Sequence, residues 1–318
     1  MGDNQLEYRL ANYVLETDWH KSQPESSRMA QDPEVRVTAA DLVARARELT
    51  TLPDIYVRVK KTLVDPASSH SDVADVLSTD PALSARLLRM ANSAFYGRPG
   101  TIATISRAVG LLGTQQIHDL VLATAVIHAF DGFSSDLLDR RVFWRSSLFG
   151  ALAAKLLADQ CGILDSERLF VGGLLAPVGT LILYQELPEQ MRSILADART
   201  LGSDVASLQR GRLGFDYARL SAELFTAWQL PPELVMPIRG HTRPSAAQDT
   251  QLEAGILYIA TQLAAARADG KSLNELVPKL NNDAWDITEL TIAKLEEIDQ
   301  EAQALTEEIA PVLLNASA

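Results

Sequence analysis

The chain has 318 residues, 47% of them hydrophobic and 22% charged, a balance typical of a globular protein with a sizeable core. Its net charge of −12 disfavours nucleic acid as a partner, because phosphate binding needs a positive face. It has no run of about 18 uncharged apolar residues and its start is polar and acidic, so we expect neither a membrane span nor a signal peptide. The single cysteine excludes an internal disulfide and a cysteine-based metal cluster, which favours a reduced, cytoplasmic protein.

The first 36 residues are predicted to form a short helix and a polar linker. Apolar side chains of residues 5–17 fall on one helical face. Residues 18–34 are polar and contain two prolines, which is typical of a linker. Simple disorder of this stretch is the alternative interpretation.

Residues 37–133 are predicted to form an N-terminal helical subdomain. Its helices are short and separated by tight loops, an arrangement that favours a compact all-α bundle. Residues suited to capping or to the first helical turn place the starts of these helices at Thr38, Pro53, Ser71, Asp80, Thr104 and Thr114.

Residues 134–280 also show helical periodicity and are predicted to form a second subdomain. Residues 140–160 are rich in alanine, which permits close packing of a neighbouring helix. Residues 166–187 are predicted to continue as one helix, and residues 250–270 form a long apolar helix.

Residues 281–318 are predicted to form an acidic C-terminal helix over about 287–313. Asp286 and Glu289 have the spacing of a capping box at its start. A seam of apolar residues follows, three and four apart: Leu295, Ile298, Ala302, Leu305, Ile309 and Val312. The seam is short, so packing on the body of the protein is favoured over pairing with a second copy. We therefore expect a monomer or a weak homodimer.

Catalytic and metal-binding motifs are scarce. No two of the five histidines lie four residues apart, so a zincin-type site is excluded. His118-Asp119 could place two ligands on a di-metal centre, but an accidental pair on a partly exposed face is the favoured interpretation. Neither a phosphate-binding glycine loop nor a serine nucleophile elbow is present. Ser146 is expected to bond the backbone of its own helix.

A series of motifs resembles the HDOD domain over residues 38–280, and we assign residues 37–280 to it. The stretch 80–97, "DPALSARLLRMANSAFYG", matches a pattern of the family, and "SRAVGLLG" (106–113) matches the next one more loosely. Further matches are Trp144 with Ser147, the "LLAPVGTL" stretch (174–181), and the segment from Trp228 to His241.

HDOD domains are similar to HD-type metal phosphohydrolases, including the HD-GYP cyclic-di-GMP phosphodiesterases, and are regarded as their regulatory relatives. The resemblance places the metal ligands and further histidines of the active relatives at or near Ser146, Ala176, Pro177, Tyr217, His241 and the Ala260-Thr261 pair. Only His241 keeps an imidazole. Alanine, proline, serine and threonine cannot assemble a di-metal centre, and without a bound metal no hydroxide nucleophile forms at neutral pH.

The resemblance implies an all-α, HD-domain-like bundle that regulates rather than catalyses and needs no cofactor. Its partner would be a signalling protein or a small molecule. The degenerate site, defined by Ser146, Ala176, Pro177, Tyr217 and His241, could hold a ligand or be filled by side chains.

A second candidate surface lies within residues 92–107 and comprises Asn92, Ser93, Tyr96, Arg98 and Arg107. Helix capping by Asn92 and Ser93 and packing of Tyr96 between the two subdomains are the alternatives. Two other functions stay open. One is a metal-dependent phosphohydrolase with displaced ligands, acting on a cyclic dinucleotide, and the other is a scaffold that dimerises through residues 287–313.

Overall fold

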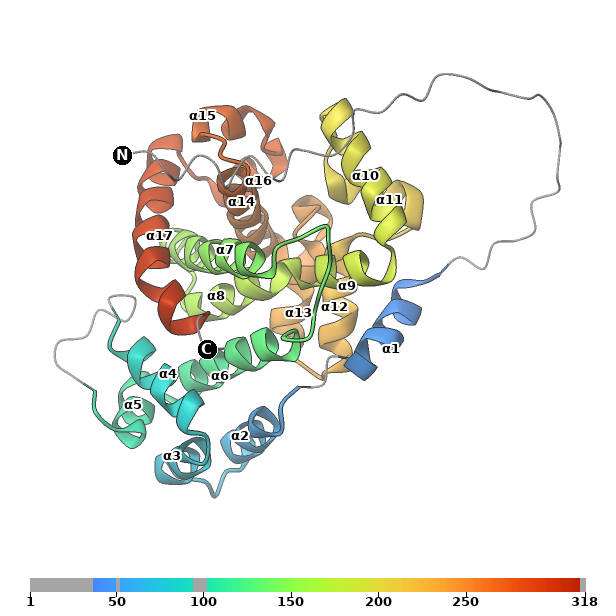
Figure 1. Cartoon of the computed structure of the whole chain (residues 1–318). Coiled ribbons are helices and arrows are strands. Elements are labelled where there is room, and N and C mark those ends of the chain that lie inside the picture. The colour runs from blue at the N-terminus through green and yellow to red at the C-terminus, as the bar shows by residue number, and fades with distance from the viewer. Residues whose placement is uncertain (1–36, 50–51, 94–101, 315–318) are drawn as a thin grey trace, which may run out of the picture. The chain divides into compact units, whose positions relative to one another are not determined.

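In the computed structural model, residues 37–49, 52–93 and 102–314 are described, and every regular element within them is helical (Figure 1). The predicted all-α fold class is therefore confirmed. These residues belong to a single unit that begins at Val37. The predicted N-terminal helix and linker lie outside the described residues.

Side-chain caps mark the starts of several of the first six helices. The Asp80 carboxylate accepts a hydrogen bond from the Leu83 N–H at 2.9 Å, and the Thr104 hydroxyl accepts one from the Arg107 N–H at 3.2 Å. The helices are α1 (Ala39–Leu49), α2 (Asp54–Val64), α3 (His70–Ser78), α4 (Pro81–Ala91), α5 (Ile105–Leu112) and α6 (Thr114–Ala129).

The predicted cap of α3 was wrong by two residues. The N-cap is Ser69, not Ser71. Ser69 and Asp72 form a reciprocal capping box: the Asp72 carboxylate accepts the Ser69 N–H at 2.7 Å, and the Ser69 hydroxyl accepts the Asp72 N–H at 3.3 Å. Ser71 has Ala74 three residues later, so it cannot form the same pair.

Helices α7 (Arg140–Gln160), α8 (Ser166–Leu175) and α14 (Gln251–Ala268) pack together in the core. The predicted close approach to the alanine-rich helix is confirmed, because a Cβ on Gly173 of α8 would lie 2.8 Å from the Ala151 Cα of α7. In Figure 1 these helices lie at the centre of the bundle, and α17 (Ile292–Leu313) packs on α7.

The predicted single helix over residues 166–187 is broken. Helix α8 ends at Leu175, a 3-10 turn spans Ala176–Val178, and α9 spans Gly179–Glu186. Pro177 lies in the turn and has no backbone N–H, so it cannot continue the α-helical hydrogen-bond ladder.

The stretch Ser166–Glu186 is long and apolar enough to cross a membrane, and among the described helices it is the one that meets this criterion. Its most apolar 18-residue window has a mean hydropathy of 1.4, but 78% of that window is buried within the protein. Burial of this kind is typical of a core helix, and α8 and α9 lie in the core of this protein.

The remaining helices surround this core. Pro188, Pro232 and the N-cap residues Asp204, Asp216 and Asn281 mark several of their starts. They are α10 (Pro188–Leu201), α11 (Val205–Leu213), α12 (Tyr217–Ala227), α13 (Pro232–Gly240), α15 (Leu273–Leu276) and α16 (Asn282–Thr288).

The predicted start of the C-terminal helix was also wrong. Helix α16 ends at Thr288, Glu289 adopts a left-handed backbone conformation with φ of 53°, and α17 begins at Ile292. Its N-cap is Thr291, whose hydroxyl accepts the Lys294 N–H at 3.3 Å. The expected Asp286–Glu289 capping box is absent, because Glu289 lies in the turn between the two helices.

The apolar seam of α17 packs on the body of the protein, against α7 and α4. Leu295, Ile298, Ala302 and Ile309 are buried, whereas Leu305 and Val312 are partly exposed. The Arg267 guanidinium of α14 also binds the Asp299 carboxylate of α17, with Nε 3.0 Å from Oδ1. Packing on the body of the protein therefore accounts for this helix face.

The Ile309→Val substitution should lower the free energy of unfolding by about 1 kcal/mol, because it removes a fully buried methylene. Ile292→Val on the same helix is the matched control, since the Ile292 side chain is about half exposed. Chemical denaturation of both variants measures the difference. Equal losses in the two variants would contradict the packing of α17 described here.

Candidate functional site

Elements distant in sequence bring the residues of the degenerate site to one region. The 3-10 turn at Ala176–Val178 packs against α8, α9, α12 and α14, and α13 packs against α12 and α14. Ser146 lies on α7, Tyr217 begins α12, and His241 caps the end of α13. The predicted residues thus come from converging helices, although their side chains meet only in part.

Ser221 of α12 closes the turn at Ala176–Val178, where the resemblance places the His-Asp pair of HD-type enzymes. Its hydroxyl donates a hydrogen bond to the Ala176 carbonyl at 2.8 Å and accepts the Gly179 N–H at 2.7 Å. Ala176 and Ser221 are both fully buried. This bridging role could not be predicted from the sequence, because the two partners lie 45 and 42 residues away.

Gly179 allows α12 to approach the turn this closely. A Cβ at this position would lie 2.1 Å from the Tyr217 carbonyl oxygen and 2.8 Å from the Ser221 nitrogen. Both contacts are with backbone atoms, which cannot move aside as a flexible side chain can. The family glycine in "LLAPVGTL" is therefore required by helix packing.

His241 is fully buried and both of its ring nitrogens are engaged. Nδ1 lies 2.7 Å from the Ile238 carbonyl, which can only accept, so Nδ1 carries the proton. Nε2 lies 3.0 Å from the Tyr217 hydroxyl and accepts a hydrogen bond from it. Burial lowers the pKa of His241 and raises the pKa of Tyr217, so both groups are neutral near pH 7.

The serine and threonine hydroxyls of α7 and α14 bond to carbonyl groups. Ser146 Oγ donates to the Ala264 carbonyl of α14 at 3.2 Å, so the expected bond to its own helix was wrong. Its neighbour Ser147 makes that local bond instead, to the Phe143 carbonyl at 2.9 Å. Thr261 Oγ1 donates to the Tyr258 carbonyl at 2.9 Å.

This arrangement does not fit a di-metal centre. The lone pair of His241 Nε2 is used by Tyr217, and the serine and threonine hydroxyls are neutral donors to carbonyls. Within the part of the chain that the structure describes, no group of three histidine, cysteine or acidic side chains could hold a metal ion. Ala176 and His241 have no exposed surface, so a ligand could contact them only by displacing side chains.

Stability should fall as the pH drops below about 6.5, because the unfolded chain protonates His241 near its ordinary pKa while the buried ring resists the proton. His241→Gln should make the unfolding free energy less dependent on pH in this window, by at most about 1.4 kcal/mol per pH unit. Urea denaturation at several pH values measures the slope. His70→Gln, at an exposed histidine, is the control, and an unchanged slope in His241→Gln would contradict the assignment.

The second predicted surface is only partly described. The Asn92 carboxamide donates to the Leu88 and Ile102 carbonyls at 2.7 and 2.8 Å and accepts the Ile102 N–H at 2.7 Å. Ser93 is buried and donates to the Met90 carbonyl at 2.7 Å. These contacts are those of helix capping, the alternative to a binding role for Asn92 and Ser93. Arg107 is exposed on α5, whereas Tyr96 and Arg98 lie outside the described residues.

His118 and Asp119, whose side chains are 13% and 11% exposed, belong to a network of polar contacts. His118 Nδ1 lies 3.0 Å from Asp119 Oδ1, and His118 Nε2 lies 3.3 Å from the Tyr56 hydroxyl. Gln115 donates to the same carboxylate at 3.0 Å. The network joins α2 to α6 and lies apart from the degenerate site in sequence.

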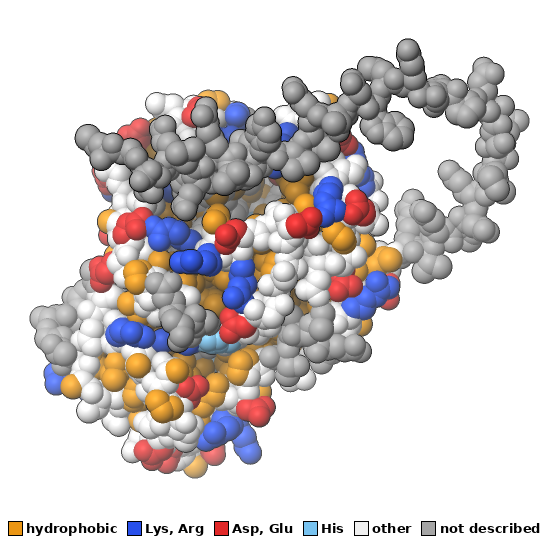
Figure 2. All heavy atoms as spheres, in the orientation of Figure 1, with side chains coloured by type: hydrophobic (Ala, Val, Ile, Leu, Met, Phe, Trp, Pro, Cys, Tyr) orange, Lys and Arg blue, Asp and Glu red, His pale blue; other side chains and the backbone are white. Residues whose placement is uncertain are grey.

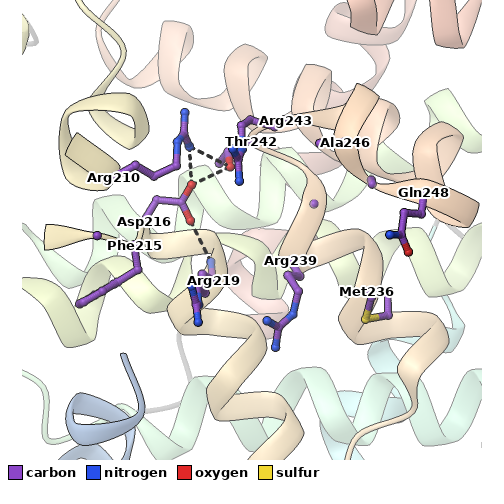
Figure 3. A pocket seen from close by; sticks show the side chains of 13 residues that line it. Arg210, Phe215, Asp216, Arg219, Met236, Arg239, Thr242, Arg243, Ala246 and Gln248 are labelled. Carbon is purple, nitrogen blue, oxygen red and sulfur yellow. Dashed lines mark hydrogen bonds and ion pairs between the residues drawn. The ribbon is translucent and has the colours of Figure 1, made fainter. Parts of the chain in front are cut away.

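A groove beside the Tyr217–His241 pair was not predictable from any sequence motif. The groove has a volume of about 340 Å³. Its lining includes Asp216, which precedes Tyr217 in the chain, and Thr242, which follows His241 (Figure 3). Four arginines lie along it: Arg210, Arg219, Arg239 and Arg243. Their spacing in the sequence follows no motif, and only the packing of α11, α12 and α13 brings them together.

Comparison with known proteins identifies the family. The HDOD domain profile matches residues 49–244. A candidate phosphohydrolase from Shewanella amazonensis is 30% identical, with a TM-score of 0.68, over 86% of this chain and 97% of its own. An HDOD domain protein from Geobacter sulfurreducens is 23% identical, with a TM-score of 0.70, over 89% of this chain and 100% of its own.

Two further relatives extend the comparison. A candidate signal transduction protein from Marinobacter aquaeolei is 22% identical, with a TM-score of 0.62, over 86% of this chain and 65% of its own. An uncharacterised protein of Treponema pallidum is 28% identical over 208 residues, which are 64% of this chain but only 39% of that protein. The profile match over residues 49–244 covers more than half of the sequence, and the chain belongs to the HDOD domain family.

Proposed function

We propose that this protein is a non-catalytic regulator in bacterial cytoplasmic signalling, which acts by binding a partner protein or a small ligand. The observation that carries the proposal is the state of His241. It is the one imidazole that remains at the expected ligand positions, and both of its nitrogens are engaged, with Ile238 and with Tyr217. A metal could bind Nε2 only after the Tyr217 hydroxyl had moved away.

The turn that replaces the His-Asp pair supports the same proposal. Ala176 and Pro177 provide no ligand atoms on their side chains, and the Ala176 carbonyl already accepts a hydrogen bond from Ser221. A site built in this way stabilises the packing of α12 on the turn. Fold similarity to hydrolases does not carry catalysis across such replacements.

The alternative is a metal-dependent phosphohydrolase with displaced ligands. The description of the Shewanella amazonensis relative as a candidate phosphohydrolase makes this alternative worth a direct test. Such an enzyme would need several carboxylate or imidazole ligands from converging helices. The degenerate site supplies one imidazole, which is already hydrogen-bonded on both sides.

A hydrolysis assay on the full chain separates the two functions. Bis(p-nitrophenyl) phosphate and cyclic di-GMP are incubated with the protein and added Mn²⁺ or Fe²⁺. We expect no turnover above that of His241→Ala assayed beside it. Metal-dependent turnover that is lost in His241→Ala would contradict the proposal and establish the alternative.

A further inference from the structure

The groove lined by Arg210, Arg219, Arg239 and Arg243, hereafter the arginine groove, has more basic than acidic side chains in its lining. Basic and acidic side chains are interspersed over the face drawn in Figure 2. The groove instead gathers four arginines around a single acidic side chain, Asp216, in a protein whose net charge is −12 (Figure 3). Such a local excess of positive charge attracts anions, because a cleft concentrates the electrostatic field of its walls.

One arginine of the groove is committed to the fold. Asp216 is buried, caps α12 by accepting the Arg219 N–H at 3.0 Å, and accepts the Thr242 hydroxyl at 2.8 Å. Arg210 completes this network by pairing with the same carboxylate and by donating to the Thr242 hydroxyl at 3.2 Å. Arg210 and Asp216 thus balance each other and fix the wall of the groove.

Among the described residues, the other three arginines share one carboxylate, that of Glu223. Arg239 and Arg219 both approach Glu223, at 3.1 Å and 3.9 Å, and their guanidinium groups lie on the same side in Figure 3. Within the described residues, Arg243 makes no ion pair and no side-chain hydrogen bond, and it is exposed. The groove therefore keeps guanidinium donors that the protein itself does not use.

We propose that this groove binds a small phosphate-bearing molecule. Guanidinium groups bind phosphate oxygens in bidentate fashion and stay charged at all physiological pH values. The volume of about 340 Å³ lies at the lower end of the range for small-molecule sites. Met236, which is 44% exposed, gives an apolar contact beside the cations. These features suit a phosphate group attached to an organic body better than inorganic phosphate alone.

The backbone of the groove gives an independent reason to expect a ligand. Gln248 lines it and has a left-handed φ of 47°, a conformation that is uncommon for residues other than glycine. Such residues cluster at ligand-binding sites, where the surrounding structure maintains them. The inference deepens the proposed regulatory function, on which it rests, by naming a ligand class and its site.

Calorimetric titration of the full chain with pyrophosphate and with ADP at low ionic strength tests the proposal. The informative variant is the double substitution Arg219→Gln and Arg243→Gln, because both side chains are exposed and neither is needed by the Arg210–Asp216 pair. The matched control, Arg58→Gln with Arg141→Gln, removes the same charge from exposed positions outside the groove lining. Circular dichroism confirms that each variant is folded.

We expect both probes to bind the native chain, and the groove variant to bind at least about tenfold more weakly than the control variant. If neither probe binds the native chain, or if the groove variant and the control variant bind equally well, the proposal is overturned. A tetraglutamate peptide is titrated in the same way. If the peptide binds and the two phosphate probes do not, the proposal is overturned and the groove would instead bind an acidic protein segment. The ADP is recovered after the titration and analysed for hydrolysis. Hydrolysis of ADP would contradict the proposed non-catalytic function. Whether the groove binds phosphate-bearing molecules is tested by the titration alone.

Discussion

Gly179→Ala is expected to lower the free energy of unfolding by about 3 kcal/mol or more, at the upper end of the cost of overpacking a core. The added Cβ would lie 2.1 Å from the Tyr217 carbonyl oxygen, so α12 must move away from the turn. That movement would also lengthen the hydrogen bond from the Gly179 N–H to Ser221. Thermal and urea denaturation, followed by circular dichroism, measure the loss.

Gly211→Ala is the matched control for this substitution. Gly211 lies within α11, and a Cβ added there would meet no atom within 4 Å. Alanine is the better helix former, so the control should gain about 0.5–1 kcal/mol. Native-like stability of Gly179→Ala would show that the turn and α12 do not pack as described.

Asp216→Asn is expected to lower the free energy of unfolding by about 3 kcal/mol, because it removes the charge that balances Arg210 in a buried position. The amide keeps an oxygen that can cap α12, so the loss reports mainly on the pair with Arg210 and on the Thr242 hydrogen bond. Urea denaturation at pH 7 measures it.

The control for Asp216→Asn is Asp136→Asn. Asp136 also pairs with an arginine, Arg192, but its side chain is 70% exposed. Exposed pairs of this kind contribute less than about 1 kcal/mol. If the two substitutions cost the same, Asp216 would not have the buried structural role assigned to it.

Local features of the fold were predictable from the sequence, because they depend on neighbouring residues. The caps at Asp80 and Thr104 and the helix Arg140–Gln160 are confirmed as predicted. One error arose where two local signals competed. Ser69 and Ser71 could both cap α3, and the capping-box partner three residues on decided between them.

The state of the candidate site was not predictable in the same way. The resemblance indicated which positions had lost their ligands, but the hydrogen bond between Ser221 and the Ala176 carbonyl joins residues 45 positions apart. The Tyr217–His241 pair also spans two helices. No periodicity or spacing reports such contacts, since they are set by how the helices pack.

The arginine groove shows the same limit more clearly. Arg210, Arg219, Arg239 and Arg243 lie in a chain with 29 basic residues, and nothing in their spacing distinguishes them. Only the structure places them around one groove and shows that the carboxylates of Asp204, Asp216 and Glu223 balance their charge incompletely. A binding site built from scattered single residues is therefore found from coordinates rather than from motifs.

Elemental analysis of the purified full chain tests the central claim most directly. The positions expected for metal ligands hold neutral groups, and His241 is hydrogen-bonded through both nitrogens. We therefore expect Fe, Mn and Zn far below one equivalent per chain, with no difference between the native protein and His241→Ala. Stoichiometric Fe, Mn or Zn that is lost on His241→Ala would contradict the non-catalytic account.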